Sequence, residues 1–241
     1  MRAKEIAWLR AAVEGVVIVG SILLAFALDA WWDERARRLE LLEQVDVLAG
    51  EMESTRAALE RVRGAHAANA DLAAHLAMVL NGVDRGAEVV VSDTLLGPLL
   101  PQVTADVTTG SLDAFLAAGG LELIDDAEVQ SYLLGWSAQV EDLLDDEIYL
   151  RNFVAADLAR HLRATSDVAR AERLSIPLVR GMFGADPPVA AELLGTVTLR
   201  REQELINLLA ARETGERGMR SELEDMLERV DRIVGALNEL R

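Results

Sequence analysis

The apolar positions of this chain form one unbroken run near the amino terminus, followed by several stripes with helical spacing. From Leu41 onward, apolar residues recur at alternating spacings of four and three, which predicts a long helix with one buried face. This seam comprises Leu41, Val45, Leu48, Met52, Thr55, Leu59, Val62, His66, Asn69, Ala73, Leu76 and Leu80. Asn81 and Gly82 carry turn chemistry, so we expect the helix to end there.

A second long helix is predicted from about Asp126 to about Thr165. Asp125 or Asp126 can cap the first free backbone amides, and Glu128 suits the positive end of the helix dipole. The buried face of this helix would consist of Val129, Leu133, Trp136, Val140, Leu143, Leu150 and Val154.

The last helix has the most regular pattern. Its a-type positions are Leu223, Val230 and Leu237, and its d-type positions are Met219, Met226, Ile233 and Leu240. Leu227 and Val234 widen this stripe, which favours a bundle of three or four helices over a two-stranded coiled coil. The apolar register slips between Arg212 and Gly218, so a local bend or stutter is expected there.

Residues 82–125 are predicted to be the only irregular portion, an insertion with an extended segment at Val89–Val91 and a short helix at Ser111–Ala118. Pro98 and Pro101 suggest a helical turn, and the glycines at 119 and 120 would stop the short helix. The segment Ser175–Pro188 is interpreted as a loop. The predicted fold class is all-α: an N-terminal transmembrane helix that continues into an antiparallel bundle of three long helices.

The apolar run from Gly15 to Leu28 predicts a membrane anchor, residues 1–32, attached to a helical domain, residues 33–241. Trp8 and Trp31 lie 23 positions apart, about 34 Å along a helix, the separation of the two interfacial belts that tryptophan prefers. Trp32 would lie at the same interface as Trp31. Because a span usually needs about 20 residues, we expect the helix to extend from Ala11 to Trp32.

Two alternatives to a retained anchor stay open. Arg2, Lys4 and Arg10 precede the run, and Ala25-Phe26-Ala27 matches the small-x-small pattern of a cleaved signal peptide. The residues before that triplet contain no helix breaker, which argues against cleavage. A soluble helical hairpin is the other alternative. Basic residues flank the run equally, and we expect the short tail inside and the large domain outside, on the periplasmic face of a bacterial inner membrane. The alternative, a cytoplasmic domain, stays open.

Net charge and composition exclude some classes of binding partner and metal site. The three basic and three acidic residues before position 33 cancel, so the whole net charge of −17 belongs to residues 33–241. Such a surface repels nucleic acid. The chain has no cysteine, which excludes disulfides and thiolate metal sites. Its single lysine beside 23 arginines is typical of a GC-rich bacterial genome.

Several segments carry a resemblance to known proteins. These are residues 28–35 (LDAWWDER), 108–112 (TTGSL) and 119–126 (GGLELIDD), followed by Trp136. Together they resemble a group of uncharacterised bacterial single-pass, membrane-anchored helical proteins, over about a fifth of the chain. The resemblance implies the architecture of an anchor followed by long helices. It implies no activity and no catalytic residue.

The candidate binding residues are polar side chains at buried helical positions: His66, Asn69, Glu147, Asp157 and His161. They could line a ligand or metal pocket inside the bundle, with Asp157 and His161 four positions apart on one face. The alternative is that they fix helix register or reach water at the edge of a seam. This alternative is favoured because the positions three before each histidine hold no glutamate, so the Glu-x-x-His pairs of di-iron bundles are absent.

Two sets of charged residues can also be interpreted either as a binding site or as part of a solvated helix surface. The run from Glu141 to Glu147 is interpreted as a solvated acidic face, since no glycine-containing loop follows it to hold calcium. The arginines at 200, 201, 212, 217 and 220 could bind an anion, but their acidic neighbours favour pairing along the helix surface.

No catalytic, phosphate-binding or zinc motif is present in the sequence. We therefore expect no enzyme, no metal and no cofactor. The sequence favours a membrane-anchored bundle with a structural or protein-interaction role, acting as a homo-oligomer or with a protein partner. The alternative is a ligand-binding sensor module that acts through a partner protein.

Overall fold

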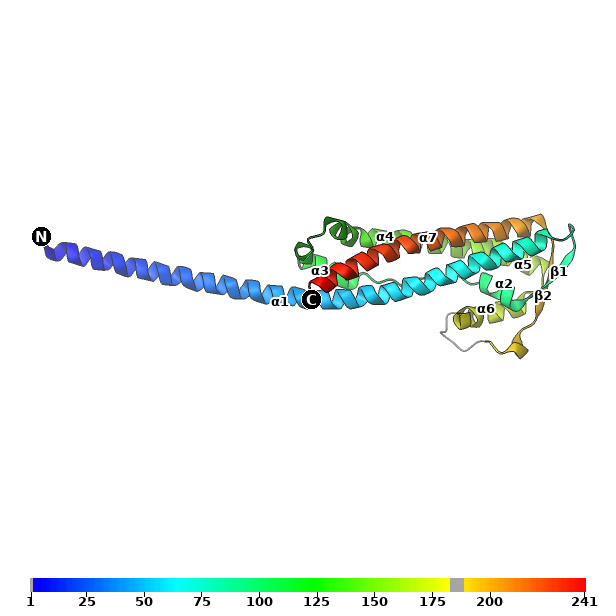
Figure 1. Cartoon of the computed structure of the whole chain (residues 1–241), viewed down its shortest axis with the longest axis horizontal. Coiled ribbons are helices and arrows are strands. Elements are labelled where there is room, and N and C mark those ends of the chain that lie inside the picture. The colour runs from blue at the N-terminus through cyan, green and yellow to red at the C-terminus, as the bar shows by residue number, and fades with distance from the viewer. Residues whose placement is uncertain (1, 183–188) are drawn as a thin grey trace.

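The computed structural model describes residues 2–182 and 189–241, with side chains described for residues 14, 15, 17–180 and 189–241. One long helix projects from an elongated helical bundle and then continues through it (Figure 1). The helical elements are α1 (Arg2–Asn81), α2 (Asp93–Leu96), α3 (Gly110–Ala117), α4 (Ala127–Phe153), α5 (Ala159–Thr165), α6 (Ala169–Met182) and α7 (Gln203–Glu239). Short 3-10 turns are η1 (Gly97–Leu99), η2 (Gly120–Leu123) and η4 (Ala191–Leu193), and η3 (Val154–Leu158) is a π-turn.

Helix α1 confirms both the predicted seam and the predicted continuity. It runs for 80 residues without a break, from the region of the expected anchor to Asn81. All twelve predicted seam positions from Leu41 to Leu80 are buried. Residues 17–40 are exposed throughout, so the helix joins the bundle at Leu41. The expectation of a single rod is therefore correct.

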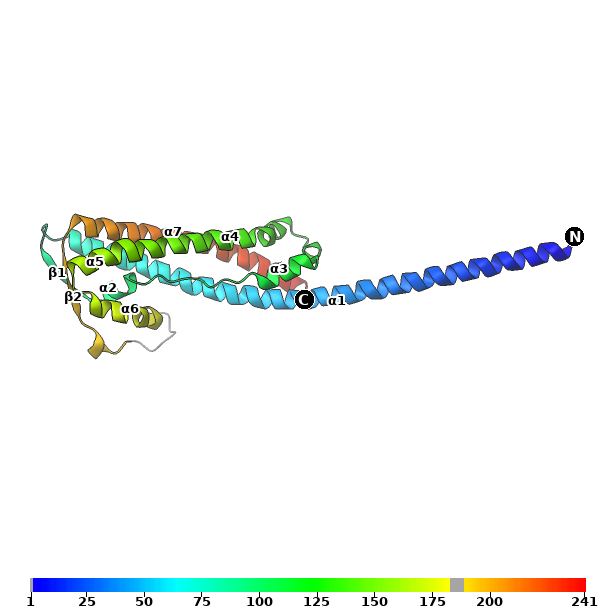
Figure 2. The same ribbon diagram turned by 180° about the vertical axis from the view of Figure 1, so that it is seen from behind.

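Helices α4, η3 and α5 together form the predicted helix at 126–165. Asp126 caps it by accepting from the backbone amides of Glu128 (2.8 Å) and Val129 (3.3 Å). All seven predicted core positions of this helix are buried. The π-turn at Val154–Leu158 was not predicted. Helix α7 runs opposite to α1 and α4, but α1 and α4 run the same way (Figures 1 and 2). The predicted antiparallel arrangement is therefore correct only for α7, because residues 100–109 return along the bundle before α4 begins.

The predicted register slip in the last helix is wrong. Helix α7 is continuous through Thr214 and Gly218. Its buried positions 205, 209, 212, 216, 219 and 223 alternate by four and three, and Arg212 and Glu216 occupy two of them. The buried face of α7 therefore continues through two charged residues, without the predicted change of register. Gly215 provides room for α4 here, since a Cβ at that position would lie 2.8 Å from Leu150 Cδ1.

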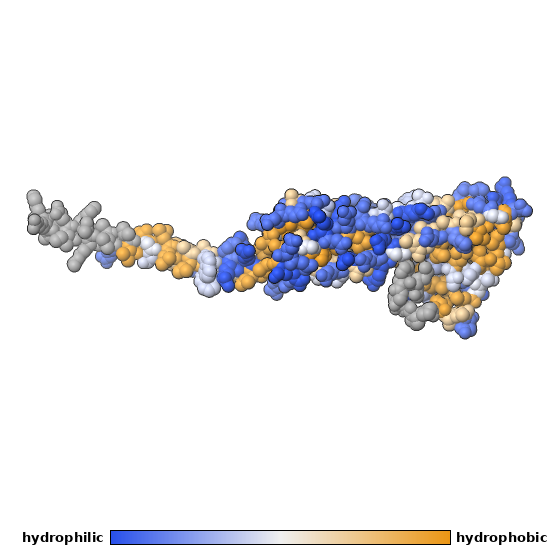
Figure 3. Space-filling view, in the orientation of Figure 1, coloured by the Kyte–Doolittle hydropathy of each residue, from blue (hydrophilic) through white to orange (hydrophobic). Residues whose placement is uncertain are grey.

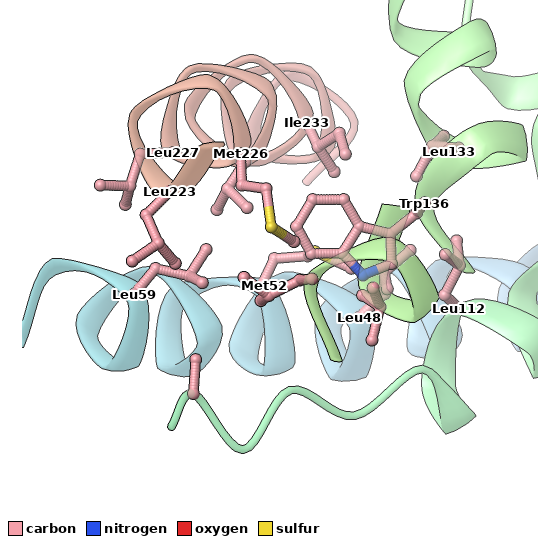
Figure 4. Close-up of a cluster of buried hydrophobic side chains, with 14 of the residues drawn as sticks. Leu48, Met52, Leu59, Leu112, Leu133, Trp136, Leu223, Met226, Leu227 and Ile233 are labelled. Carbon is pink, nitrogen blue, oxygen red and sulfur yellow. The ribbon is translucent and has the colours of Figure 1, made fainter. Parts of the chain in front are cut away.

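The core consists of two apolar clusters. The cluster nearer the projecting helix is formed by α1, α3, α4 and α7, with Trp136 packed among Met52, Met226 and Ile233 (Figure 4). The second cluster lies at the distal end, the end farthest from the projecting helix, and includes Leu76, Leu158 and Leu209. On α1 the first cluster ends at Val62 and the second begins at Ala73. The residues between these limits include the buried polar positions.

A two-stranded antiparallel sheet lies at the distal end. Strand β1 (Glu88–Ser92) contains the extended segment predicted at Val89–Val91, and it pairs with β2 (Thr196–Arg200), which was not predicted. The register places Glu88 opposite Arg200 and Ser92 opposite Thr196. Residues 82–125 are therefore not the only portion outside the long helices.

The short elements of the insertion match their predictions, whereas the predicted loop does not. Helix α3 lies within one residue of the predicted helix, and the α2–η1 turn contains Pro98. Gly119 adopts φ 85°, a left-handed conformation that ends α3 at little steric cost. The loop predicted at Ser175–Pro188 is wrong over Ser175–Met182, because α6 covers those residues and contains Pro177. Residues 183–188 lie outside the described part.

Among the described residues, no helix is both long and apolar enough to cross a membrane. The structure does not describe the side chains of residues 1–13 and 16. Position 16 lies within the predicted apolar run Gly15–Leu28, and positions 1–13 precede that run. Trp8, expected at the membrane interface, is one of these residues.

Candidate functional site

Arg212 and Glu216 form the centre of a buried polar layer between the two apolar cores. Both side chains have 0% exposure, and Arg212 Nη2 lies 2.6 Å from Glu216 Oε1. Arg212 also donates from Nη1 to the side-chain oxygen of Gln102 (2.8 Å) and from Nη2 to the backbone oxygen of Pro101 (3.1 Å). The guanidinium of Arg212 therefore links α7 to the returning segment 100–109.

Helices α1 and α4 supply the other members of this layer. His66 Nδ1 contacts Glu216 Oε2, and Asn69 is buried one helical turn after His66. Glu147 Oε1 accepts a hydrogen bond from the backbone amide of Ala105 (2.7 Å), so a second contact holds the returning segment. Three of the predicted site residues, His66, Asn69 and Glu147, thus belong to one layer.

Burial dominates the electrostatics of the layer. It raises the pKa of Glu147, against the lowering effects of the Ala105 amide, His66 and Arg151. It lowers the pKa of Arg212, and Glu216 opposes that shift. A charged group in such a site is stable only with its partners in place. The charged groups of the layer contact protein groups from four segments, which is the arrangement expected for fixing helix register, although His66 Nε2 and Arg212 Nε are buried without a hydrogen-bond partner.

Asp157 and His161 lie elsewhere, so the five candidate residues do not line one pocket. His161 follows Glu147 by 14 positions, which separates them by about 21 Å along the helix axis. Asp157 and His161 line a separate surface cavity of about 360 Å³, together with Arg160, Ala164, Glu204 and Leu208. The sequence placed them correctly on one helix face but could not place that face relative to His66.

The geometry around His161 is loose. Its Nε2 lies 3.6 Å from Glu202 Oε2, and its Nδ1 lies 3.7 Å from Glu204 Oε1. These distances are too long for hydrogen bonds. Asp157 faces Arg160 instead, at 3.2 Å. In the described part of the chain, no three His, Cys, Asp or Glu side chains are grouped so that they could hold a metal ion.

The acidic run on α4 is solvated as predicted, except at one end. Asp142, Asp145 and Asp146 are exposed, whereas Glu147 is buried in the polar layer. Glu222 of α7, which was not predicted, faces this run. Its burial, together with the neighbouring carboxylates of Asp146, Asp142 and Glu147, raises the pKa of Glu222 to about 7. Only the packing of α7 beside α4 brings these groups together, so no local sequence signal marks Glu222.

The candidate arginines divide into two groups. Arg217 pairs with Glu213 (2.8 Å), and Arg220 pairs with Glu224 (3.0 Å), as the expected helix-surface pairs. Arg212 also pairs four residues along the helix, but inside the core. Arg200 and Arg201 instead line a cavity at the distal end of the bundle.

The tryptophans that follow the apolar run are exposed. The rings of Trp31 and Trp32 are 5.1 Å apart in an edge-to-face arrangement, and the guanidinium of Arg35 lies 5.8 Å from the ring centre of Trp31. The bundle covers neither ring.

No family model, curated protein or solved structure matches this chain.

Proposed function

We propose that this protein is a single-pass, membrane-anchored helical bundle of a bacterial inner membrane, with a structural or protein-interaction role on the periplasmic side. The observation that carries the proposal is the unpartnered apolar stretch of α1. Its large apolar side chains from Val17 to Leu28 are between 50% and 66% exposed. They are Val17, Ile18, Val19, Ile22, Leu23, Leu24, Phe26 and Leu28.

A lipid bilayer accounts for this surface. Soluble monomers rarely expose contiguous apolar patches larger than a few hundred Å². The stretch projects away from the bundle, and a hydrophilic part of the helix separates it from the bundle (Figure 3). Burial of each such side chain would contribute about 1.5–3 kcal/mol. Trp31, Trp32 and Arg35 follow the stretch, where aromatic rings and a cation suit the headgroup region.

Alkaline carbonate extraction of cell membranes tests the anchor. The full chain should remain in the membrane pellet. Leu23→Arg should shift the protein to the soluble fraction, because a charge near the middle of a span opposes insertion. Leu39→Arg is a matched control, since Leu39 is similarly exposed (59% against 62% for Leu23) but lies beyond the tryptophans. A mature protein that begins at Leu28 and is soluble would contradict the proposal.

Exposed apolar side chains on α4, which lie among the exposed aspartates of the acidic run, support the interaction role. Helix α4 carries Leu134, Leu144, Ile148 and Tyr149 on its outer side, with exposures between 44% and 73%. A photo-crosslinking residue in place of Tyr149 should capture a neighbour in intact membranes. A product of twice the chain mass would identify a second copy, and another mass would identify a partner. Absence of any product at position 149, with the same result at 148, would contradict the interaction role.

The second candidate function is a ligand-binding sensor module that acts through a partner protein. It is favoured by the two cavities at the distal end of the bundle, one beside His161 and one beside Arg200.

A further inference from the structure

The turn between α1 and β1 folds over the junction between β2 and α7. The Gly86 amide donates to the backbone oxygen of Arg201 (3.0 Å), and the Arg201 amide donates to the backbone oxygen of Ala87 (2.8 Å). Gly86 adopts φ 81°, which allows the tight turn. These contacts bring Arg85 from one segment beside Arg200 and Arg201 from the other.

The three arginines line a cavity of about 490 Å³, which also includes Gly86, Glu202, Gln203 and Glu204. This volume lies within the range of small-molecule sites, about 300–1,000 Å³. The lining residues belong to the turn before β1, the end of β2 and the start of α7. These elements meet at the end of the bundle farthest from the projecting helix (Figures 1 and 2).

These arginines lack the ion-pair partners that Arg170 and Arg217 have. Arg170 lies 2.7 Å from Asp93, and Arg217 lies 2.8 Å from Glu213. In the described part of the chain, no side-chain hydrogen bond or ion pair joins Arg85, Arg200 or Arg201 to another group, and Arg201 Nε is shielded from solvent without a partner. Acidic residues outnumber basic ones by 41 to 24 overall, so three unpaired guanidinium groups at one place are notable.

The two glutamates of the cavity lie near the ring of His161, which lines the neighbouring cavity. The carboxylates of Glu202 and Glu204 lie within 3.6 and 3.7 Å of the His161 ring. The first turn of α7 adds positive potential, since Glu202 provides no side-chain cap for its free amides.

We propose that the cavity lined by Arg85, Arg200 and Arg201 binds a small oxyanion that carries phosphate or carboxylate groups. Guanidinium groups bind both kinds of oxyanion through paired hydrogen bonds. The proposal rests on the second candidate function, ligand binding, and does not depend on the membrane anchor.

Calorimetric titration of the full chain in a neutral detergent tests this site. Inorganic pyrophosphate and citrate are titrated separately at constant ionic strength, to distinguish phosphate from carboxylate ligands. Saturable binding of either anion is expected, and Arg201→Gln should weaken it about tenfold. Arg173→Gln removes the same charge from an exposed arginine outside the cavity and should leave binding unchanged.

Two results would overturn the proposal. One is the absence of saturable binding of both anions at millimolar concentration, and the other is equal weakening by the two substitutions. Hydrogen exchange of the unmodified protein provides a test that needs no variant. The bound anion should slow exchange at the amides of residues 84–87 and 203–205, and protection elsewhere alone would also refute the site. Carbonate extraction of Arg201→Gln should match that of the unmodified chain, which separates this test from that of the anchor.

Discussion

Arg212 and Arg217 make ion pairs of the same spacing on the same helix in opposite environments. Each pairs with a glutamate four positions away, Arg212 with Glu216 and Arg217 with Glu213. Arg212 and Glu216 are fully buried, whereas Arg217 is 63% exposed. Water can hydrate an exposed charge when its partner is removed, but it does not reach a buried one. The two arginines should therefore differ widely in their contributions to stability.

The first prediction compares Arg212→Met with Arg217→Met. Loss of Arg212 leaves Glu216 buried without the arginine and removes two hydrogen bonds to the returning segment. The free energy of unfolding should therefore fall by about 3–5 kcal/mol. Loss of Arg217 should change it by less than about 1 kcal/mol. Urea unfolding of both variants in detergent measures the difference. Similar midpoints would show that the polar layer is not essential for stability.

The second prediction concerns the pH dependence caused by Glu222. Its pKa in the folded protein is about 7, above the ordinary value of 4.5, so the folded state binds its proton more tightly than the unfolded state. Stability should therefore decrease as pH rises from about 4.5 to about 7, by about 1 kcal/mol after solvent screening of this half-buried group. Below pH 4.5 Glu222 is protonated in both states and causes no loss.

Melting curves of Glu222→Gln across this pH range measure the effect. The variant should match the unmodified chain near pH 4.5 and melt at a higher temperature near pH 7.5. Glu228→Gln, which neutralises an exposed carboxylate on the same helix, is the control. A Glu222→Gln variant that loses stability in parallel with the unmodified protein would show that this carboxyl is not the cause.

At the scale of elements, the seams of the long helices could be predicted wherever apolar residues carry the pattern. The predicted seam of α1 matches the buried face of the helix because it includes the polar residues His66 and Asn69. The predicted seam of α7 has a gap because it leaves out Arg212 and Glu216, which are buried positions of that helix. Charged residues ordinarily mark the outer face of a helix, and only the partners seen in the folded chain explain their burial.

The missed strand had a local signal. Residues 196–200 alternate between exposed and buried, with Val197 and Leu199 inward, which is the period of a strand. Its partner β1 lies about 100 residues earlier in the chain, so no hairpin turn connected them. The anion cavity depends on this pairing, since it brings Arg85 to Arg200. Neither the cavity nor the separation of His161 from His66 could be predicted without the packing.

The third prediction tests the α7 seam as a packing surface. Val230 has 0% exposure, and Val230→Asp would place a carboxylate among apolar side chains, which should lower stability by several kcal/mol. Ala211→Asp, at an exposed position of the same helix, should cost about 1 kcal/mol or less. Equal losses in thermal melting at 230 and 211 would refute the seam.

At the scale of the whole molecule, the chain has a long axis along which its properties change. An exposed apolar helix is followed by an apolar core, a buried polar layer, a second apolar core and the arginine-lined cavity. If the apolar helix lies in a bilayer, the bundle begins at Leu41, nine residues beyond Trp32 or about 13 Å along the rod. The cavity would then open at the end of the bundle farthest from the lipid.

The last prediction follows from the independence of the bundle from the projecting helix. Residues 17–40 are exposed, so a chain that begins at residue 33 should keep both cores and unfold at the same urea concentration as the full chain in detergent. It should also remain monodisperse without detergent, because the apolar stretch is gone. A chain that begins at residue 50 loses Leu41, Val45, Leu48 and Ala49 from the core, and it should be destabilised by several kcal/mol or fail to fold. If removal of residues 1–32 destabilises the bundle as much as removal of residues 1–49, the projecting helix is part of the folded domain and the proposed division between anchor and bundle is wrong.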